Sequence, residues 1–233
     1  MSYSNSWEQA EVALRVADRV FIGGTPAAGK TYLATNYGLK DGQKVYSLTV
    51  TPDMGVLSVL GGMMPNEKGT FSFVGGPVYR AMTEGARLVI NEIALASSDV
   101  YALLLGACDS KDSAFITLPN NEMLRPAPGY QVVATSNSRL EEMEEPLQTR
   151  FPVGLWVEKP NPKAFEVFPP AMRGLVQDTI GSVASDAGDR VISLRHWIEI
   201  KHVIETNGKS ADALLVAKSI LGNTMAVHAW RAM

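Results

Sequence analysis

The chain has 233 residues, 46% of them hydrophobic and 19% charged, and its formal net charge is −3. This composition is typical of a soluble globular protein with room for one large domain, alone or with a small second one. The small negative charge excludes a global attraction to nucleic acid or anionic membrane.

The first 160 residues alternate between strand and helix patterns, which predicts an α/β domain on a parallel sheet. Strands are expected at residues 19–22, 44–51, 87–93, 130–135 and 153–157. Helices are expected at residues 7–17, 31–35, 77–84, 98–107 and, as a short turn, 146–150. Residues 54–76 and 114–128 each predict a hairpin-like excursion, the first with exposed apolar tips, a break at 61–65 and a turn at 66–69.

A proline-rich stretch, residues 160–170, marks a change of organisation. After it, residues 171–184, 193–205 and 210–231 are helical in pattern and carry no strand signal. The sequence therefore predicts an α/β domain over residues 1–160 and a small helical domain over residues 161–233. One cysteine, Cys108, excludes an intrachain disulfide. No apolar run approaches the ~18 residues of a membrane span, and the N-terminal residues show no signal region, so we expect a cytoplasmic protein.

The stretch between the first strand and the second helix fits the phosphate-binding loop pattern G-x-x-x-x-G-K-T. Its residues are Gly24, Thr25, Pro26, Ala27, Ala28, Gly29, Lys30 and Thr31. Glycines let the backbone approach phosphate oxygens, and the inward N–H groups and the start of the next helix favour an anion. Lys30 is predicted to contact the β- and γ-phosphates, and the Thr31 hydroxyl to bind Mg²⁺.

Polar residues follow two of the predicted central strands and add catalytic candidates. Asn91 and Glu92 end the strand at 87–93, where Asn91 is a candidate Mg²⁺ contact and Glu92 a candidate general base. Asn137 follows the strand at 130–135 and is suited to orienting the attacking water. Arg150 is a candidate arginine finger toward a neighbouring subunit, and Arg195 a candidate phosphate contact from the helical domain.

This order of motifs resembles the AAA+ ATPases, and most closely their MoxR / dynein-related branch. The run from Gly76 to Ile93 fits that branch's pattern G-P-x-x-R-A-x-x-x-G-A-x-L-x-x-x-E-I. The resemblance covers about residues 15–205. It implies a P-loop NTPase core with a C-terminal α-helical lid and the cofactors ATP and Mg²⁺.

The resemblance also assigns roles to single residues. It implies that residues 24–31 are Walker A and 88–92 Walker B, that Asn137 is sensor 1, Arg150 the arginine finger and Arg195 sensor 2. The two hairpin-like stretches resemble the helix-2 insert and the pre-sensor hairpin, which face the pore and the substrate. A hexameric ring with nucleotide between subunits is implied, as is a protein partner, for instance one carrying a von Willebrand factor A domain.

One departure from the family pattern is Asn91, where an aspartate is usual. An amide oxygen can still orient a Mg²⁺-bound water but lacks the charge that strengthens the contact, so slow Mg²⁺-dependent hydrolysis is predicted. Two alternatives stay open. A nucleic-acid motor would need basic hairpins, where only Lys68 and Arg125 are evident. An ATP-gated scaffold with little hydrolysis would follow from Asn91.

Overall fold

The computed structural model describes residues 7–65, 67 and 69–232. The chain divides into two compact units, one of Met1–Thr25 with Lys30–Glu158 and one of Pro26–Gly29 with Lys159–Met233. None of the helices in the described ranges combines the length and apolarity that a membrane crossing requires.

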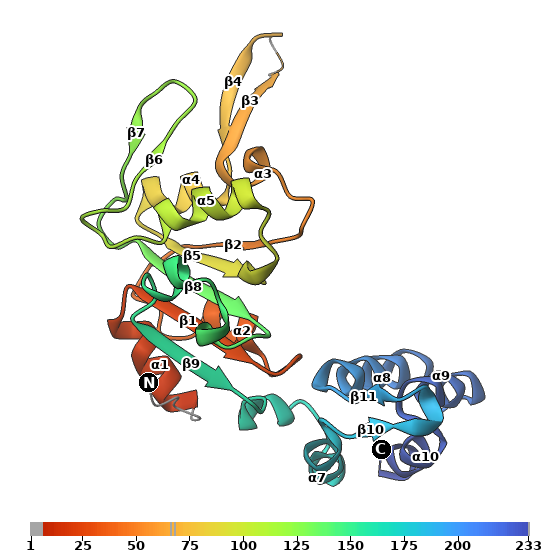
Figure 1. Cartoon of the computed structure of the whole chain (residues 1–233). Coiled ribbons are helices and arrows are strands. Elements are labelled where there is room, and N and C mark those ends of the chain that lie inside the picture. The colour runs from red at the N-terminus through yellow and green to blue at the C-terminus, as the bar shows by residue number, and fades with distance from the viewer. Residues whose placement is uncertain (1–6, 66, 68, 233) are drawn as a thin grey trace. The chain divides into compact units, whose positions relative to one another are not determined.

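The first unit is built on a five-stranded, all-parallel sheet with the order β2-β5-β8-β1-β9 (Figure 1). Its strands are β1 (Arg19–Gly24), β2 (Val45–Thr49), β5 (Arg87–Asn91), β8 (Gln131–Ser136) and β9 (Val153–Val157). All five coincide with predicted strands, and the parallel pairing confirms the α/β fold class. Strands β5 and β8 are buried at every residue, which is why their sequences are nearly continuous apolar runs.

Helices cover both faces of this sheet. They are α1 (Trp7–Val16), α2 (Lys30–Asn36), α4 (Pro77–Glu84), α5 (Ser98–Ala107) and the short α6 (Glu145–Gln148). Along β5, Leu88 and Ile90 pack in one apolar cluster with residues of α4 and α5. Arg87 and Asn91 alternate with them and bond to α2 or to the residues just after it. Because successive side chains of a strand point to opposite faces of the sheet, β5 has one apolar face and one face with a polar residue at each end.

Arg87 is fully buried, and its hydrogen bonds with the described residues go to an amide oxygen and to backbone carbonyls, not to a carboxylate. Its five N–H groups donate instead to Gln131 Oε1 (2.6 Å) and to backbone carbonyls at the ends of α1 and α2. These carbonyls belong to Leu14 (3.2 Å), Ala34 (2.9 Å), Tyr37 (2.6 Å) and Gly38 (2.8 Å). Helix C-termini carry partial negative charge, so they suit a buried cation. Burial lowers the pKa of Arg87 to about 10, which leaves the guanidinium charged at neutral pH.

Two hairpins extend from the same end of the first unit (Figure 1). The first follows the short helix α3 (Val56–Leu60) and pairs β3 (Gly61–Pro65) with β4 (Phe71–Gly75); the second pairs β6 (Ile116–Thr117) with β7 (Met123–Leu124). The predicted excursions are therefore hairpins, but the predicted break at residues 61–65 is wrong, because β3 occupies it. Gly61 permits this with a φ of 101°, where a Cβ would collide with the Val74 carbonyl oxygen. The predicted turn includes residues 66 and 68, which lie outside the described residues.

The second unit is mainly helical, with a core around the fully buried Trp197. Its elements are α7 (Pro170–Thr179), β10 (Val183–Ala184), β11 (Arg190–Val191), α8 (Leu194–Asn207), α9 (Ala211–Leu221) and α10 (Asn223–Ala232). Two predictions fail here. The helix expected to reach residue 184 ends at Thr179, and the antiparallel β10–β11 pair follows although no strand was expected. The single helix expected over 210–231 is two helices, because Gly222 has a φ of 82° and Asp186 Oδ2 accepts from Asn223 N at 2.7 Å, where α10 begins.

Candidate functional site

The predicted phosphate loop joins the end of β1 to the start of α2. Gly24 is required by the sheet, since a Cβ there would collide with the Val157 carbonyl oxygen of the neighbouring β9. Thr25 also bonds to the end of β9, donating from its N–H to Val157 O (3.1 Å). Ala27 and Gly29 have left-handed φ angles of 61° and 90°. Left-handed residues in a tight loop are typical of backbone nests that bind anions.

Lys30, the first residue of α2, is buried with 7% of its surface exposed. Its ammonium donates to the carbonyl oxygens of Gly24 (3.0 Å) and Thr25 (2.9 Å), and to Asn137 Oδ1 (2.8 Å). The lysine charge therefore lies beside its own loop, between the carboxyl ends of β1 and β8.

Thr31 and Asn91, the two predicted magnesium contacts, are hydrogen-bonded to each other. The Thr31 hydroxyl donates to Asn91 Oδ1 at 2.9 Å, and the Thr135 hydroxyl of β8 donates to the same oxygen at 3.2 Å. Asn91 is 4% exposed, and its Nδ2 donates to Ser47 Oγ of β2 (2.9 Å) and to the Leu48 carbonyl (3.3 Å). Partners on β2, β8 and α2 thus hold this one amide.

Glu92 and Asn137 complete the cluster. Glu92 follows β5 in a left-handed conformation with φ 56° and ψ 43°, which is uncommon for a residue with a side chain. Asn137 Nδ2 lies 3.4 Å and 3.3 Å from the two carboxylate oxygens of Glu92. Since Asn137 Oδ1 accepts from Lys30, its amide bridges the ammonium and the carboxylate.

The two predicted arginines belong to different units, Arg150 to the first and Arg195 to the second. Arg150 is bound within its own unit, donating to the carbonyls of Leu105 (2.8 Å) and Pro146 (2.7 Å) and pairing with Asp109 Oδ2 at 3.1 Å. It does not join the cluster around Lys30. Arg195 is the second residue of α8 in the second unit, and it is exposed. The roles predicted for both residues stay predictions.

Sequence reasoning missed Ser47 and Arg87, and it named Thr135 only as the end of a strand. Alternation along β2 and β5 places Ser47 on the Asn91 side of the sheet, but that signal is usable only when the strand order is known. Arg87 was counted within an apolar run because it sits at the start of a buried strand.

The side-chain atoms available as metal ligands determine how a cation could bind here. Among the residues that the structure describes, no three or more His, Cys, Asp or Glu side chains gather in a way that could hold a metal ion. Thr31 and Asn91 offer neutral oxygens, which suit Mg²⁺ by type but supply no charge. A cation here would therefore depend on the negative charge of a phosphate ligand.

Comparison with known proteins agrees with this geometry. The family model described as AAA domain (dynein-related subfamily) matches residues 19–151. A curated, uncharacterized protein of Staphylococcus epidermidis is 30% identical over 161 residues, covering 64% of this chain and 60% of that protein. YojN of Bacillus subtilis, also uncharacterized, is 30% identical over 149 residues, covering 61% of this chain and 48% of that protein. The chain thus spans about half to three fifths of these relatives.

Solved structures share the fold. NtrX from Brucella abortus has a TM-score of 0.55 at 16% identity, covering 99% of this chain and 51% of that one. A RuvB mutant from Thermotoga maritima has a TM-score of 0.50 at 19% identity, covering 95% and 64%. At these identities the likeness concerns the fold alone. The family model spans more than half of the chain and includes the phosphate loop and the Asn91–Glu92 pair, so this protein belongs to the dynein-related subfamily of AAA-domain proteins.

Proposed function

We propose that this chain is a MoxR-type AAA+ ATPase that binds and hydrolyses ATP at the subunit interfaces of a hexameric ring and so remodels or assembles a protein partner. One observation carries the proposal. Lys30, Asn137 and Glu92 form a hydrogen-bonded chain at the carboxyl ends of β1, β8 and β5. The carboxyl edge of a parallel sheet is where α/β proteins bind nucleotides.

Each residue of the proposed site has its own role in binding or hydrolysing ATP. Residues 24–31 surround the phosphates with backbone N–H groups, and Lys30 exchanges its carbonyl partners for phosphate oxygens. A Glu92 carboxylate oxygen accepts a proton from the attacking water, and the Asn137 amide orients that water. Bound Mg²⁺ would neutralise charge on the phosphates. Thr31 and Asn91 would hold it through the threonine hydroxyl and, directly or through water, the amide oxygen.

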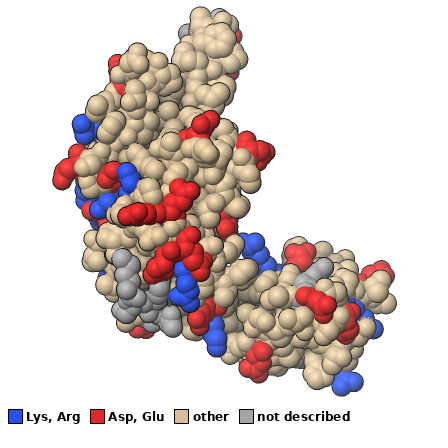
Figure 2. Space-filling view, in the orientation of Figure 1, with Lys and Arg blue, Asp and Glu red and all other residues tan. Residues whose placement is uncertain are grey.

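The structure also favours a protein partner over nucleic acid. On the first hairpin Met63, Met64, Phe71 and Val74 are exposed, as are Phe115 and Met123 on or beside the second. Of the residues that the structure describes, Figure 2 shows almost no Lys or Arg at the outer ends of these hairpins on the face in view; Lys68 lies outside the described residues. Exposed apolar and methionine side chains suit contacts with polypeptide, whereas nucleic acid requires cations. A partner with a von Willebrand factor A domain is one candidate.

Phosphate release by the purified chain with ATP and Mg²⁺ tests the proposal. We expect slow release by the wild type and a loss of about a hundredfold or more in Glu92→Gln, because the amide cannot accept the proton. Glu11→Gln, an exposed change in α1, is the matched control and should hydrolyse like the wild type. Equal rates in all three would contradict the role of Glu92.

A second candidate, an ATP-gated scaffold with little turnover, is favoured by the uncharged Asn91. It predicts ATP-dependent oligomerisation without phosphate release in the same assay. Salt-sensitive binding of single-stranded DNA would instead support a nucleic-acid motor and contradict the choice of a protein partner.

A further inference from the structure

The Asn91 side chain has a complete set of hydrogen-bond partners. Oδ1 accepts from the hydroxyls of Thr31 and Thr135, and Nδ2 donates to Ser47 Oγ and to the Leu48 carbonyl oxygen. All four partners lie within 3.3 Å. A buried amide with every donor and acceptor used has one preferred orientation.

The Leu48 carbonyl decides which orientation this is. A backbone carbonyl only accepts hydrogen bonds, so the amide nitrogen of Asn91 must face it. The Ser47 hydroxyl, the shorter of the two contacts at 2.9 Å, gives the nitrogen its second acceptor. Rotation of the amide by 180° would set Oδ1 against the Leu48 carbonyl oxygen. The two acceptors of Asn91 Nδ2 therefore fix the direction in which Asn91 Oδ1 points.

The oxygen in turn orients Thr31. Because the Thr31 hydroxyl hydrogen points to Asn91 Oδ1 at 2.9 Å, its lone pairs face away from Asn91. This is the arrangement in which a hydroxyl can both donate to the amide and bind a cation. An aspartate at position 91 would place a carboxylate oxygen against the Leu48 carbonyl, 3.3 Å from the present Nδ2, so these surroundings suit an amide.

We propose that Ser47 is a positioning residue that holds the Asn91 amide with its oxygen toward Thr31, and that it thereby strengthens the binding of Mg²⁺ with nucleotide. This role rests on the proposed function. Ser47 lies on the edge strand β2, outside the phosphate loop and the Walker B strand, and it accepts a hydrogen bond from Asn91, one of the two predicted Mg²⁺ contacts.

The experiment measures ADP affinity of the full chain in excess Mg²⁺ and in EDTA, and the ratio of the two affinities is the metal-dependent gain. We expect Ser47→Ala to lower this gain roughly fivefold, the effect of one neutral hydrogen bond, and to leave the affinity in EDTA unchanged. Ser47→Thr keeps the hydroxyl and should keep the gain. Ser72→Ala, an exposed serine on β4, is the matched control and should behave like the wild type.

A double-mutant cycle separates positioning from a general structural effect. If Ser47 acts through the amide, Ser47→Ala has no further effect on the gain in an Asn91→Ala chain. An unchanged gain in Ser47→Ala, or effects of the two changes that simply add, would overturn the inference while leaving nucleotide binding itself intact. A wild-type chain that binds no ADP would overturn the proposed function and the role of Ser47 together.

Discussion

Arg87 and Asn91 lie four residues apart on the same face of β5 and hold opposite ends of α2. Asn91 accepts from Thr31 at the start of the helix, and Arg87 donates to the carbonyls of Ala34 and Tyr37 at its end. The helix that follows the phosphate loop is thus fixed to the central sheet by one buried polar residue at each terminus. The position of α2 therefore affects both the stability of the fold and the geometry of the candidate site.

Replacing Arg87 should destabilise the first unit strongly. Arg87→Met keeps much of the side-chain length but removes five hydrogen bonds, three of them buried, so we expect a loss of about 3–5 kcal/mol in unfolding free energy. Urea denaturation with a constant m-value measures it. Arg80→Met is the control, since Arg80 is exposed, pairs with Glu84 at 3.9 Å and lies over the Tyr46 ring at 4.7 Å; its loss should stay at about 1 kcal/mol or less. Equal losses in the two variants would contradict the structural role of Arg87.

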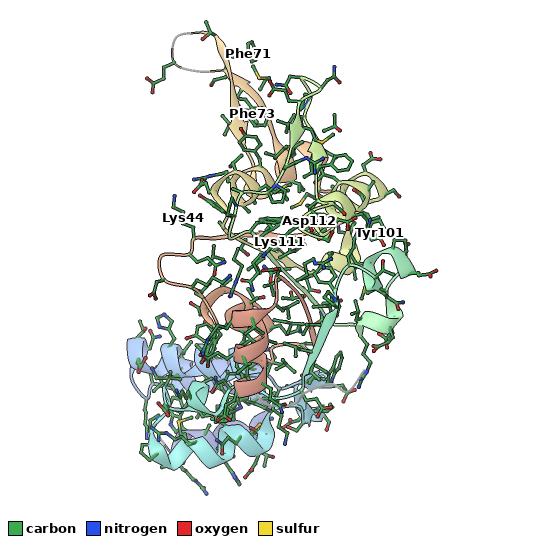
Figure 3. The ribbon with its side chains drawn as sticks, turned by 90° about the vertical axis from the view of Figure 1, so that its left-hand side faces the viewer. Lys44, Phe71, Phe73, Tyr101, Lys111 and Asp112 are labelled. Atoms are coloured by element: carbon green, nitrogen blue, oxygen red, sulfur yellow. The ribbon has the colours of Figure 1, made fainter. Side chains whose placement is uncertain are left out.

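The first hairpin offers a matched pair of phenylalanines. Phe71 lies toward the tip and is 66% exposed, whereas Phe73 lies toward the base and packs edge-on against Tyr79 at 4.9 Å (Figure 3). Phe73→Ser should therefore cost about 1–3 kcal/mol of stability, and Phe71→Ser less than about 0.5 kcal/mol. Thermal unfolding of both variants tests the difference. A larger loss in Phe71→Ser would show that the tip residue supports the fold and is not kept for a partner.

Mixed assemblies test whether Arg150 acts on a neighbouring subunit. Lys30→Ala chains should bind ATP too weakly to hydrolyse it at low ATP concentration, and Arg150→Ala chains should bind it without hydrolysing it. If Arg150 works in trans, mixing the two inactive variants restores part of the phosphate release. If Arg150 only fixes α6 through Leu105, Pro146 and Asp109, the mixture stays inactive and Arg150→Ala loses thermal stability instead.

The reactivity of Cys108 can report on local or global unfolding of the protein. It is fully buried, and burial raises the pKa of its thiol to about 12. The native protein should therefore hold almost no thiolate at pH 8, and labelling should require local or global unfolding. We expect a thiol reagent to modify native protein on the order of a thousandfold more slowly than urea-unfolded protein. Fast native labelling would contradict this burial.

Local patterns were sufficient to predict much of the first unit. Buried parallel strands read as apolar runs, Gly85 ends α4 with a φ of 64°, and the phosphate loop has a fixed spacing. The break between α9 and α10 was harder to predict, because the apolar pattern continues across Gly222 and the contact with Asp186 at the start of α10 is distant in sequence.

The hydrogen-bonded polar residues around the start of α2 could not be predicted from the sequence for a similar reason. Ser47, Asn91, Thr135 and Thr31 meet only because β2, β5 and β8 are neighbours in the sheet, and the sequence does not give the strand order. Asn91 and Glu92 could be chosen because they end a buried strand. Ser47 sits inside an edge strand, and no local signal distinguishes it from any other exposed strand residue.

The central claim is that the Lys30 ammonium belongs to a nucleotide site, and its most direct test is ADP affinity measured by titration calorimetry. The wild type should bind ADP with Mg²⁺, and Lys30→Ala should bind it about ten- to a hundredfold more weakly, the effect of lost charge-assisted hydrogen bonds. Lys44→Ala, which removes an exposed lysine paired with Glu84, should bind like the wild type. A Lys30→Ala chain that binds ADP as tightly as the wild type would contradict the account.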